Sequence, residues 1–270
     1  MINKQDLLDS YKKYGITEEN VCKSRIGIFG NDVDEIAVIA PLHRPEAYIE
    51  LGCEVTQLSF GYYPAYRIKK DDFQFTFICT QIGACNVGEI VVALAFSNCK
   101  KVIFTGSCGA LKPNIEIGDI FLPEFSMCGD GAVKYFTKGN VLDNYCFGKK
   151  FYPTKDLQNC LINYMDKQTL TPYKFIKNFS IDTIVAQFLH IDEIVSMGAD
   201  VVEMETALVF CVAQITNLEA VAILNVSDST CAKKSLLGGR TKEELDRHVY
   251  TEKTLVPSLV LGFLSDLTNN

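Results

Sequence analysis

Short apolar runs recur along the chain, and most of them are bounded by glycine, proline or charged residues. Runs of this length and composition are typical of buried β-strands. The pattern predicts strands over residues 35–40, 73–80, 101–105, 118–123, 173–181, 200–204 and 220–228.

Segments with helical spacing of apolar residues separate these strands. The spacing predicts helices over residues 87–97, 154–167 and 241–267, and a further helix that runs from Leu208 to a turn at Thr216 and Asn217. Residues 129–152 are polar and contain glycines, which predicts a loop over the sheet edge. Strand and helix alternate without a flexible linker or an internal repeat. We therefore predict an α/β fold: one three-layer domain over residues 1–270, with a central mixed β-sheet flanked by helices and an N-terminal extension over residues 1–34.

The composition of the 270 residues is that of a globular protein, with 48% hydrophobic and 22% charged residues. The net charge of −7 argues against the basic surface that nucleic-acid binding requires. The longest apolar stretch contains Gln214, Asn217 and Glu219, so the sequence does not predict a membrane span. The polar N-terminus lacks the apolar core of a signal peptide, and we expect a cytoplasmic protein.

The eleven cysteines are scattered singly, without a Cys-x-x-Cys pair. Cys79 and Cys211 lie inside apolar runs, where cysteine behaves as a small hydrophobic residue. Three histidines leave little from which to build a zinc site. The counts favour a reduced protein that holds no metal ion.

Three acidic residues lie where predicted strands end, namely Glu203, Glu205 and Asp228. Open α/β sheets bind their ligands at this edge. Carboxylates bind hydroxyl groups, and a buried carboxyl group can donate a proton. The cleavage of a sugar from a basic leaving group requires both functions. Other interpretations remain open, because glutamates at a helix start are stabilised by the helix dipole and Asp228 could cap the segment that follows it.

Closely spaced glycines follow the predicted strand 101–105, in the order Gly106-Ser107-Cys108-Gly109. Such a turn can direct backbone N–H groups at an anion or a sugar oxygen, with the Ser107 hydroxyl beside them. It can equally be a tight connection with no ligand.

Taken together, these motifs resemble those of the nucleoside phosphorylase/nucleosidase superfamily. That family includes hexameric purine nucleoside phosphorylases, uridine phosphorylases and the methylthioadenosine/adenosylhomocysteine nucleosidases. The resemblance rests on the order of Gly-Ser-Cys-Gly-Ala after one strand, Glu-Met-Glu before a helix and Ser-Asp after the next strand, and it runs from about Glu35 to Asp228. Thr80-Gln81-Ile82-Gly83, before a helix, resembles a fourth motif.

The resemblance implies roles for individual residues. Glu205 would bind the ribose hydroxyls, with Met204 against the sugar and Glu203 in the same substrate site. Ser107 and the Gly106 backbone would line the site of the attacking phosphate or water. Asp228 would hydrogen-bond or protonate N7 of a purine leaving group, as an acid whose pKa is raised by burial can do.

The same positions imply a base preference. The pair formed by Ser227 and Asp228 resembles the purine branch of the family. Ile184 stands where the family usually has an aromatic residue that stacks on the base, which weakens stacking. We expect a purine nucleoside as the substrate.

The phosphate site departs from the family pattern. Phe104, Glu46 and Gly61 stand where the phosphorylases have phosphate-binding arginines. Arg44 could reach the phosphate instead, which would keep phosphorolysis. Alternatively, water is the nucleophile and Glu46 is its general base, or Glu46 is simply a solvated carboxylate at a helix start.

Arg240 follows Asp228 in the sequence and could pair with it and tune its protonation. It could equally be a surface residue. Our first expectation is phosphorolysis of a purine nucleoside to free base and sugar 1-phosphate, with phosphate as co-substrate and no cofactor. The alternatives are hydrolysis and a catalytically inactive nucleoside-binding module. The resemblance also implies a homo-oligomer, either a dimer or a hexamer.

Overall fold

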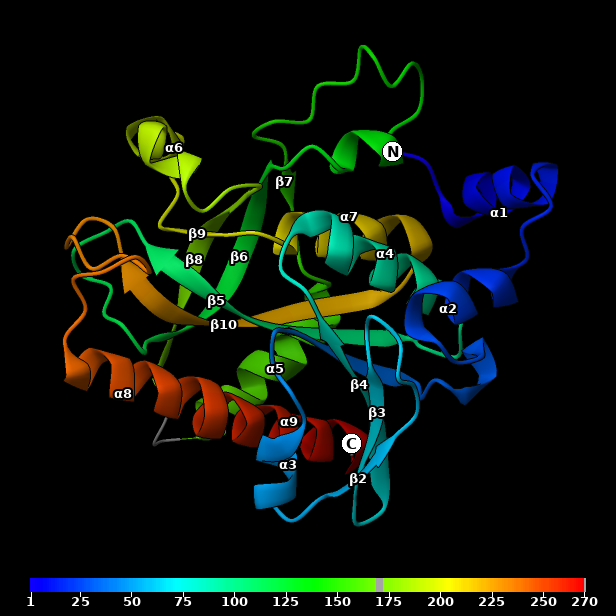
Figure 1. Ribbon diagram of the computed structural model, residues 1–270, viewed down its shortest axis with the longest axis horizontal. Coiled ribbons are helices and arrows are strands. Elements are labelled where there is room, and N and C mark those ends of the chain that lie inside the picture. Colours follow the sequence, from blue (N-terminus) through cyan, green and yellow to red (C-terminus); the bar gives the residue numbers. More distant parts are fainter. Residues whose placement is uncertain (169–171, 270) are drawn as a thin grey trace.

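The computed structural model describes residues 1–168 and 172–269, which form a ten-stranded mixed sheet covered by helices (Figure 1). The strands are β1 (Ile36–Pro41), β2 (Glu54–Gln57), β3 (Ala65–Lys70), β4 (Phe73–Thr80), β5 (Lys101–Ala110), β6 (Ile120–Gly129), β7 (Lys150–Phe151), β8 (Tyr173–Ile181), β9 (Val201–Glu203) and β10 (Glu219–Ser229). The helices are α1 (Lys4–Lys13), α2 (Glu18–Ile26), α3 (Glu46–Glu50), α4 (Ala84–Ala95), α5 (Lys155–Lys167), α6 (Ile191–Ser196), α7 (Thr206–Thr216), α8 (Lys242–Tyr250) and α9 (Val256–Asn269). Short 3₁₀ turns lie at Gly30–Asp32, Val133–Phe136 and Ala186–Leu189, and one π-helical turn, Thr251–Leu255, joins α8 to α9.

Part of the sheet closes into a ring around β5. The first half of β5 pairs in parallel with β1, its whole length pairs in parallel with β10, and its last two residues pair with β9 in the antiparallel direction. β10 continues to β6, β6 to β8, and β8 back to β9. The strands β1, β4, β3 and β2 extend from the ring as an open sheet. Although β8 and β9 run antiparallel to β5 and β10, ring closure brings residues from the carboxyl ends of all four strands around one opening.

Helices cover both faces of the sheet (Figure 1). α2, α4 and α7 pack on one face, while α3, α5 and α9 pack on the other. α4 and α7 are apolar nearly all round, which is the pattern of helices buried in the core. The layers confirm the predicted α/β fold with a central mixed sheet between helices.

The bounds predicted for β4 and β8 are those of the structure. The predicted turn at Gly106-Ser107-Cys108-Gly109 is wrong, because β5 continues to Ala110. Backbone pairing with β10 holds these residues in an extended strand, although their glycines favour a turn. Residues 129–152 are mostly loop, as predicted, but β6 reaches Gly129 and β7 adds a short strand. The hairpin of β2 and β3 was not predicted.

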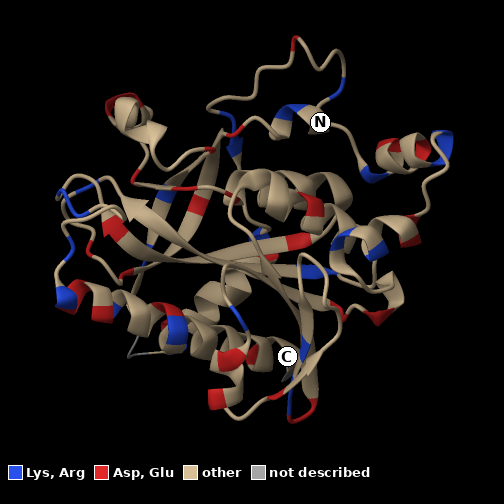
Figure 2. Cartoon of the chain, viewed as in Figure 1, with Lys and Arg blue, Asp and Glu red and all other residues tan. Residues whose placement is uncertain are grey.

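Charged residues are dispersed over the molecule. Figure 2 shows Lys and Arg interspersed with Asp and Glu on many elements rather than gathered on one face. In residues 1–168 and 172–269, no helix is long and apolar enough to cross a membrane.

Candidate active site

A cavity of about 350 Å³ lies at the carboxyl ends of β1, β5, β9 and β10. It collects most of the site residues predicted from the sequence: Gly106, Ser107, Ile184, Glu203, Met204, Glu205, Ser227 and Asp228. These residues come together because ring closure places several strand ends around one opening.

Glu203 holds the start of α7. Its Oε2 accepts hydrogen bonds from the backbone N–H groups of Glu205 (2.8 Å) and Thr206 (2.7 Å). Its Oε1 accepts from Asn178 Nδ2 at 2.7 Å and from the Ser180 hydroxyl. Burial raises the pKa of Glu203, while these four donors act in the opposite direction. Each carboxylate oxygen of Glu203 already accepts two hydrogen bonds from the protein. Glu203 therefore fits the interpretation of a glutamate that stabilises the start of a helix.

Glu205 has far fewer partners than Glu203. Oε1 accepts from the Gly83 backbone N–H at 2.5 Å, and Oε2 accepts from the Met204 N–H at 3.3 Å. Burial, together with the charge of Glu203, raises the pKa of Glu205 to about 8. Gly83 has φ of +103°, a conformation that favours glycine, so the fourth sequence motif is explained by this contact. The remaining acceptor capacity of Glu205 is available to ligand hydroxyl groups.

Asp228 faces the cavity because of an irregularity in β10. The pairing of β10 with β5 shifts register between Val226 and Asp228, which is a bulge that re-aims side chains. Ser227 Oγ donates to Asp228 Oδ1 at 2.7 Å. A Cβ on Gly109 would lie 3.2 Å from both carboxyl oxygens, so the glycine makes room for the acid.

Burial raises the pKa of Asp228, although the hydrogen bond from Ser227 and the charge of Arg240 oppose the shift. Arg240 Nη1 donates to the Ser227 carbonyl at 3.1 Å, so the guanidinium lies beside the acid. The interpretation of Asp228 as a helix cap is wrong, because Thr241 caps the helix that follows.

The cavity wall also contains residues that sequence reasoning did not select. His43, His248, Glu252 and Lys253 all line the cavity. His43 Nε2 lies 2.8 Å from Glu252 Oε1. The sequence could have indicated His248 and Glu252 through their i, i+4 spacing, because residues with this spacing lie on one face of a helix.

Gln187 is another residue that the sequence did not reveal. It lines the cavity from the turn Ala186–Leu189, and its Nε2 donates to the Ile184 carbonyl at 2.9 Å. Its Oε1 is buried and has no hydrogen-bond partner within residues 1–168 and 172–269. A ligand N–H group would satisfy this oxygen.

Arg44 and Glu46 do not line this cavity. They line a neighbouring hollow of about 460 Å³, which shares Leu42, His43, Glu252 and Lys253 with it. Phe104 is fully buried, and its ring would lie 2.8 Å from a Cβ on Gly106. Gly61 has nothing within 4 Å of an added Cβ. Of the described residues that line the cavity, none is an arginine.

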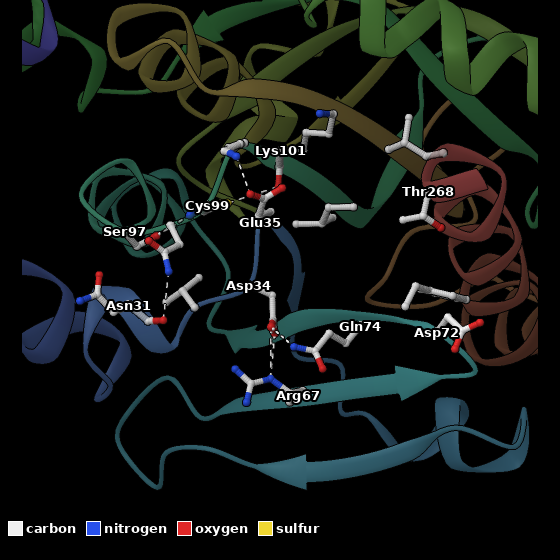
Figure 3. Close-up of a pocket in the computed structure, with 16 residues that line it drawn as sticks. Asn31, Asp34, Glu35, Arg67, Asp72, Gln74, Ser97, Cys99, Lys101 and Thr268 are labelled. Atoms are coloured by element: carbon white, nitrogen blue, oxygen red, sulfur yellow. Dashed lines mark hydrogen bonds and ion pairs between the residues drawn. The ribbon is translucent and has the colours of Figure 1, made fainter. Parts of the chain in front are cut away.

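A larger, open hollow of about 1000 Å³ lies at the opposite ends of β1 and β5 (Figure 3). There Arg67 Nε, Gln74 Nε2 and the Thr76 hydroxyl all donate to the Asp34 carboxylate, at 3.1, 2.6 and 2.8 Å. Figure 3 shows Arg67 and Gln74 pointing at Asp34. Because these polar groups satisfy one another, the hollow is a weaker candidate for a ligand site.

The fold and the cavity together define an α/β protein of the nucleoside phosphorylase-like class. Residues 25–264 match the Phosphorylase superfamily, and the chain belongs to this family. Members of the family are enzymes that cleave nucleosides, as phosphorylases or as nucleosidases. The resemblance noted in the sequence is confirmed.

Solved structures share the fold at low identity. Uridine phosphorylase from Vibrio fischeri ES114 is 19% identical, with a TM-score of 0.72 over 89% of this chain and 94% of that one. Purine nucleoside phosphorylase from Toxoplasma gondii is 19% identical, with a TM-score of 0.68 over 89% and 94%. The 5′-methylthioadenosine/S-adenosyl homocysteine nucleosidase of Campylobacter jejuni is 20% identical, with a TM-score of 0.67 over 85% and 98%.

Proposed function

We propose that this protein cleaves the N-glycosidic bond of a purine nucleoside, with water as the attacking nucleophile. The observation that carries the proposal is the meeting of Glu205 and Asp228 in one cavity. One carboxyl group has spare acceptor capacity for sugar hydroxyls, and the other is a buried acid. Sugar binding and leaving-group protonation therefore have separate groups.

The chemistry follows from these two groups. Asp228, whose pKa is raised by burial, retains its proton more readily and transfers it to N7 of the departing purine. The sugar develops positive charge as the bond to the base lengthens. Glu205 holds the hydroxyls, and the Glu252 carboxylate, whose pKa is lowered, stabilises that charge from the cavity wall.

Purine as the base is supported by the cavity wall. Ile184, Ile181 and Val202 offer an apolar surface to a flat ring. The unpartnered Oε1 of Gln187 accepts from an N–H group of the base. A volume of about 350 Å³ falls within the usual range for small-molecule sites.

Water as the nucleophile is supported by the charges near the sugar. A phosphate dianion is normally held by arginine, through charge-assisted paired hydrogen bonds. Here the described wall carries the Glu252 carboxylate and no arginine. Glu252 would repel a phosphate, whereas an uncharged water molecule is unaffected.

Phosphorolysis, the first expectation from the sequence, is the second candidate. It is favoured by Lys253, which lines both the cavity and the neighbouring hollow, and by Arg44 in that hollow. A small displacement of the shared wall would join the two spaces and bring both cations to a phosphate.

Product analysis distinguishes these candidates. Purified protein is incubated with inosine, adenosine, uridine and methylthioadenosine, with and without phosphate, and the products are separated by chromatography. We expect a purine and free sugar in the absence of phosphate. Release that requires phosphate would establish the second candidate, and no release from any substrate would refute cleavage altogether.

Variants then test the roles of the two acids. Asp228→Asn should lower kcat by about 10²–10⁴-fold, the usual contribution of a general acid. Glu205→Gln should weaken nucleoside binding, as measured by calorimetry. Glu193→Gln, at an exposed carboxylate on α6, is the matched control.

A further inference from the structure

His43, Glu252 and His248 form a cluster on the wall between the cavity and the neighbouring hollow, hereafter the histidine cluster. His43 Nε2 lies 2.8 Å from Glu252 Oε1, and His248 Nε2 lies 3.8 Å from the same oxygen. The three side chains are 25%, 19% and 12% exposed, respectively. All three line the cavity, and neither sugar binding nor base protonation uses them.

We infer that His43 is the base that takes a proton from the attacking water, and that Glu252 and His248 are positioning residues that hold it ready. The inference rests on the proposed function. It replaces Glu46, the base expected from the sequence, because Glu46 lines only the neighbouring hollow.

His43 has the hydrogen-bond pattern of a base. Its Nε2 donates to the Glu252 carboxylate, which leaves Nδ1 with a free lone pair. Over residues 1–168 and 172–269, Nδ1 has no hydrogen-bond partner. A carboxylate behind an imidazole fixes the tautomer and stabilises the imidazolium that forms when the other nitrogen takes a proton.

The backbone holds this arrangement from both sides. Leu42, next to His43, has φ of +62°, and its N–H donates to the Thr80 carbonyl at 2.8 Å. Such a conformation is uncommon for residues other than glycine and persists only where the surroundings impose it. Glu252 lies in the π-helical turn Thr251–Leu255, a type of turn frequently found at functional sites.

His248 links Glu252 to the far side of the cavity. The Ser107 hydroxyl donates to Asn225 Oδ1 at 3.3 Å, and Asn225 Nδ2 donates to His248 Nδ1 at 3.0 Å. His248 therefore carries its proton on Nε2, which faces Glu252. Burial lowers the pKa of His248, so the ring favours its neutral form and packs beside Glu252 at 3.8 Å without competing for it as a cation.

Glu252 remains a carboxylate in this setting. Burial acts to raise the pKa of Glu252, but the hydrogen bond that it accepts from His43 is the main cause that holds this pKa below its ordinary value. An ionised Glu252 is the partner that an imidazole base requires.

The step balances with these groups. The water oxygen forms a bond to C1′ of the sugar, and one water proton passes to Nδ1 of His43. The bond from C1′ to the base nitrogen breaks, its electron pair stays with the purine, and Asp228 supplies the proton to N7. The products are a free purine and a free sugar, and solvent returns the proton from His43 to Asp228.

The pH dependence of the base reflects every charged group near it. Those groups come from the loop after β1, from α3, from β9 and the start of α7, from α8 and the π-helical turn, and from β10 and the segment after it. They are Arg44, Glu46, Glu203, Glu205, His248, Glu252, Lys253, Asp228 and Arg240. Because the base must be unprotonated, kcat should fall on the acidic side of its profile.

The test compares the kcat–pH profiles of wild type, His43→Gln, Glu252→Gln and a matched control. The control is His190→Gln, which removes an exposed histidine that is also paired with a glutamate, Nδ1 to Oε2 of Glu193 at 2.7 Å. His43→Gln should lower kcat by about 10²–10⁴-fold with little change in KM, and it should abolish the acidic limb. Glu252→Gln should lower kcat by about 10–100-fold with little change in KM, because the imidazole loses the carboxylate that orients it. His190→Gln should match wild type.

Each outcome decides the matter. If wild type hydrolyses nucleosides and His43→Gln retains kcat within about threefold, His43 is not the base and only this inference fails. If Glu46→Gln abolishes activity while His43→Gln does not, the base is Glu46. If wild type releases no base, or does so only with phosphate, the proposed function fails as well. Thermal melting of each variant separates these results from unfolding, and a fall in kcat without a change in KM in Glu252→Gln is a second readout.

Discussion

Glu203→Gln tests how the start of α7 is held. In the wild type, Glu203 accepts from two backbone N–H groups at 2.8 and 2.7 Å, and from Asn178 and Ser180 on its other oxygen. A glutamine has one acceptor oxygen, so its NH₂ group must face one of these two pairs of donors. Buried donors would therefore be left without a partner.

The magnitude follows from the number of donors. Each buried donor that loses its partner costs about 1–3 kcal/mol, so the loss of two costs about 2–6 kcal/mol. Burial raises the pKa of Glu203, which means that removing the charge returns part of this loss. We expect a net destabilisation of about 2–4 kcal/mol, or a fall in Tm of roughly 5–12 °C for a chain of this size.

Urea unfolding and calorimetry of wild type and Glu203→Gln measure the effect. Glu193→Gln, which alters an exposed carboxylate, should change stability by less than about 0.5 kcal/mol. A loss of less than about 0.5 kcal/mol in Glu203→Gln would refute the reasoning, because it would place Glu203 among ordinary surface substitutions.

Three further predictions concern the cavity. The folded-state pKa of Glu205 is raised from 4.5 to about 8, so between these pH values the folded protein binds more protons than the unfolded chain. The free energy of unfolding should therefore decline as pH rises from about 5 to 8. Glu205→Gln should flatten that decline in urea titrations at several pH values. Gly83→Ala should destabilise the protein by about 1–2 kcal/mol in thermal unfolding, because φ at Gly83 is +103°. The added methyl group has ample space, so the backbone conformation alone causes the loss. Unchanged stability would contradict this account. Gln187→Leu should raise KM for a purine nucleoside by roughly tenfold with kcat nearly unchanged, since an unpaired acceptor is lost; equal KM values in steady-state kinetics would exclude Gln187 from base recognition.

Local pattern was enough to predict much of the fold. β4 and β8 have the predicted bounds because apolar and aromatic residues recur between polar ones along each of them, as is typical of a strand. The hairpin of β2 and β3 was missed, since most of its residues are exposed or only partly buried and carry little apolar periodicity. The turn predicted at Gly106–Gly109 failed because local glycine content was outweighed by pairing with β10, a strand more than a hundred residues away in the sequence.

The sequence by itself determined which side chains lie at the strand ends. Motifs of neighbouring residues, such as Glu203-Met204-Glu205 and Ser227-Asp228, keep their relation in any fold that preserves the strand and the helix around them. Open α/β sheets bind their ligands at strand ends, so these motifs were predicted to share a site. The structure brings them into one cavity.

Only the tertiary structure decided what faces those motifs. Closure of the ring through β10 and the packing of α8 against it bring His248 and Glu252 to His43, a residue more than two hundred positions earlier. The same packing leaves Arg44 and Glu46 in the neighbouring hollow. A contact between such distant residues depends on the way the whole chain packs, and no local pattern of hydrophobic and polar residues encodes it.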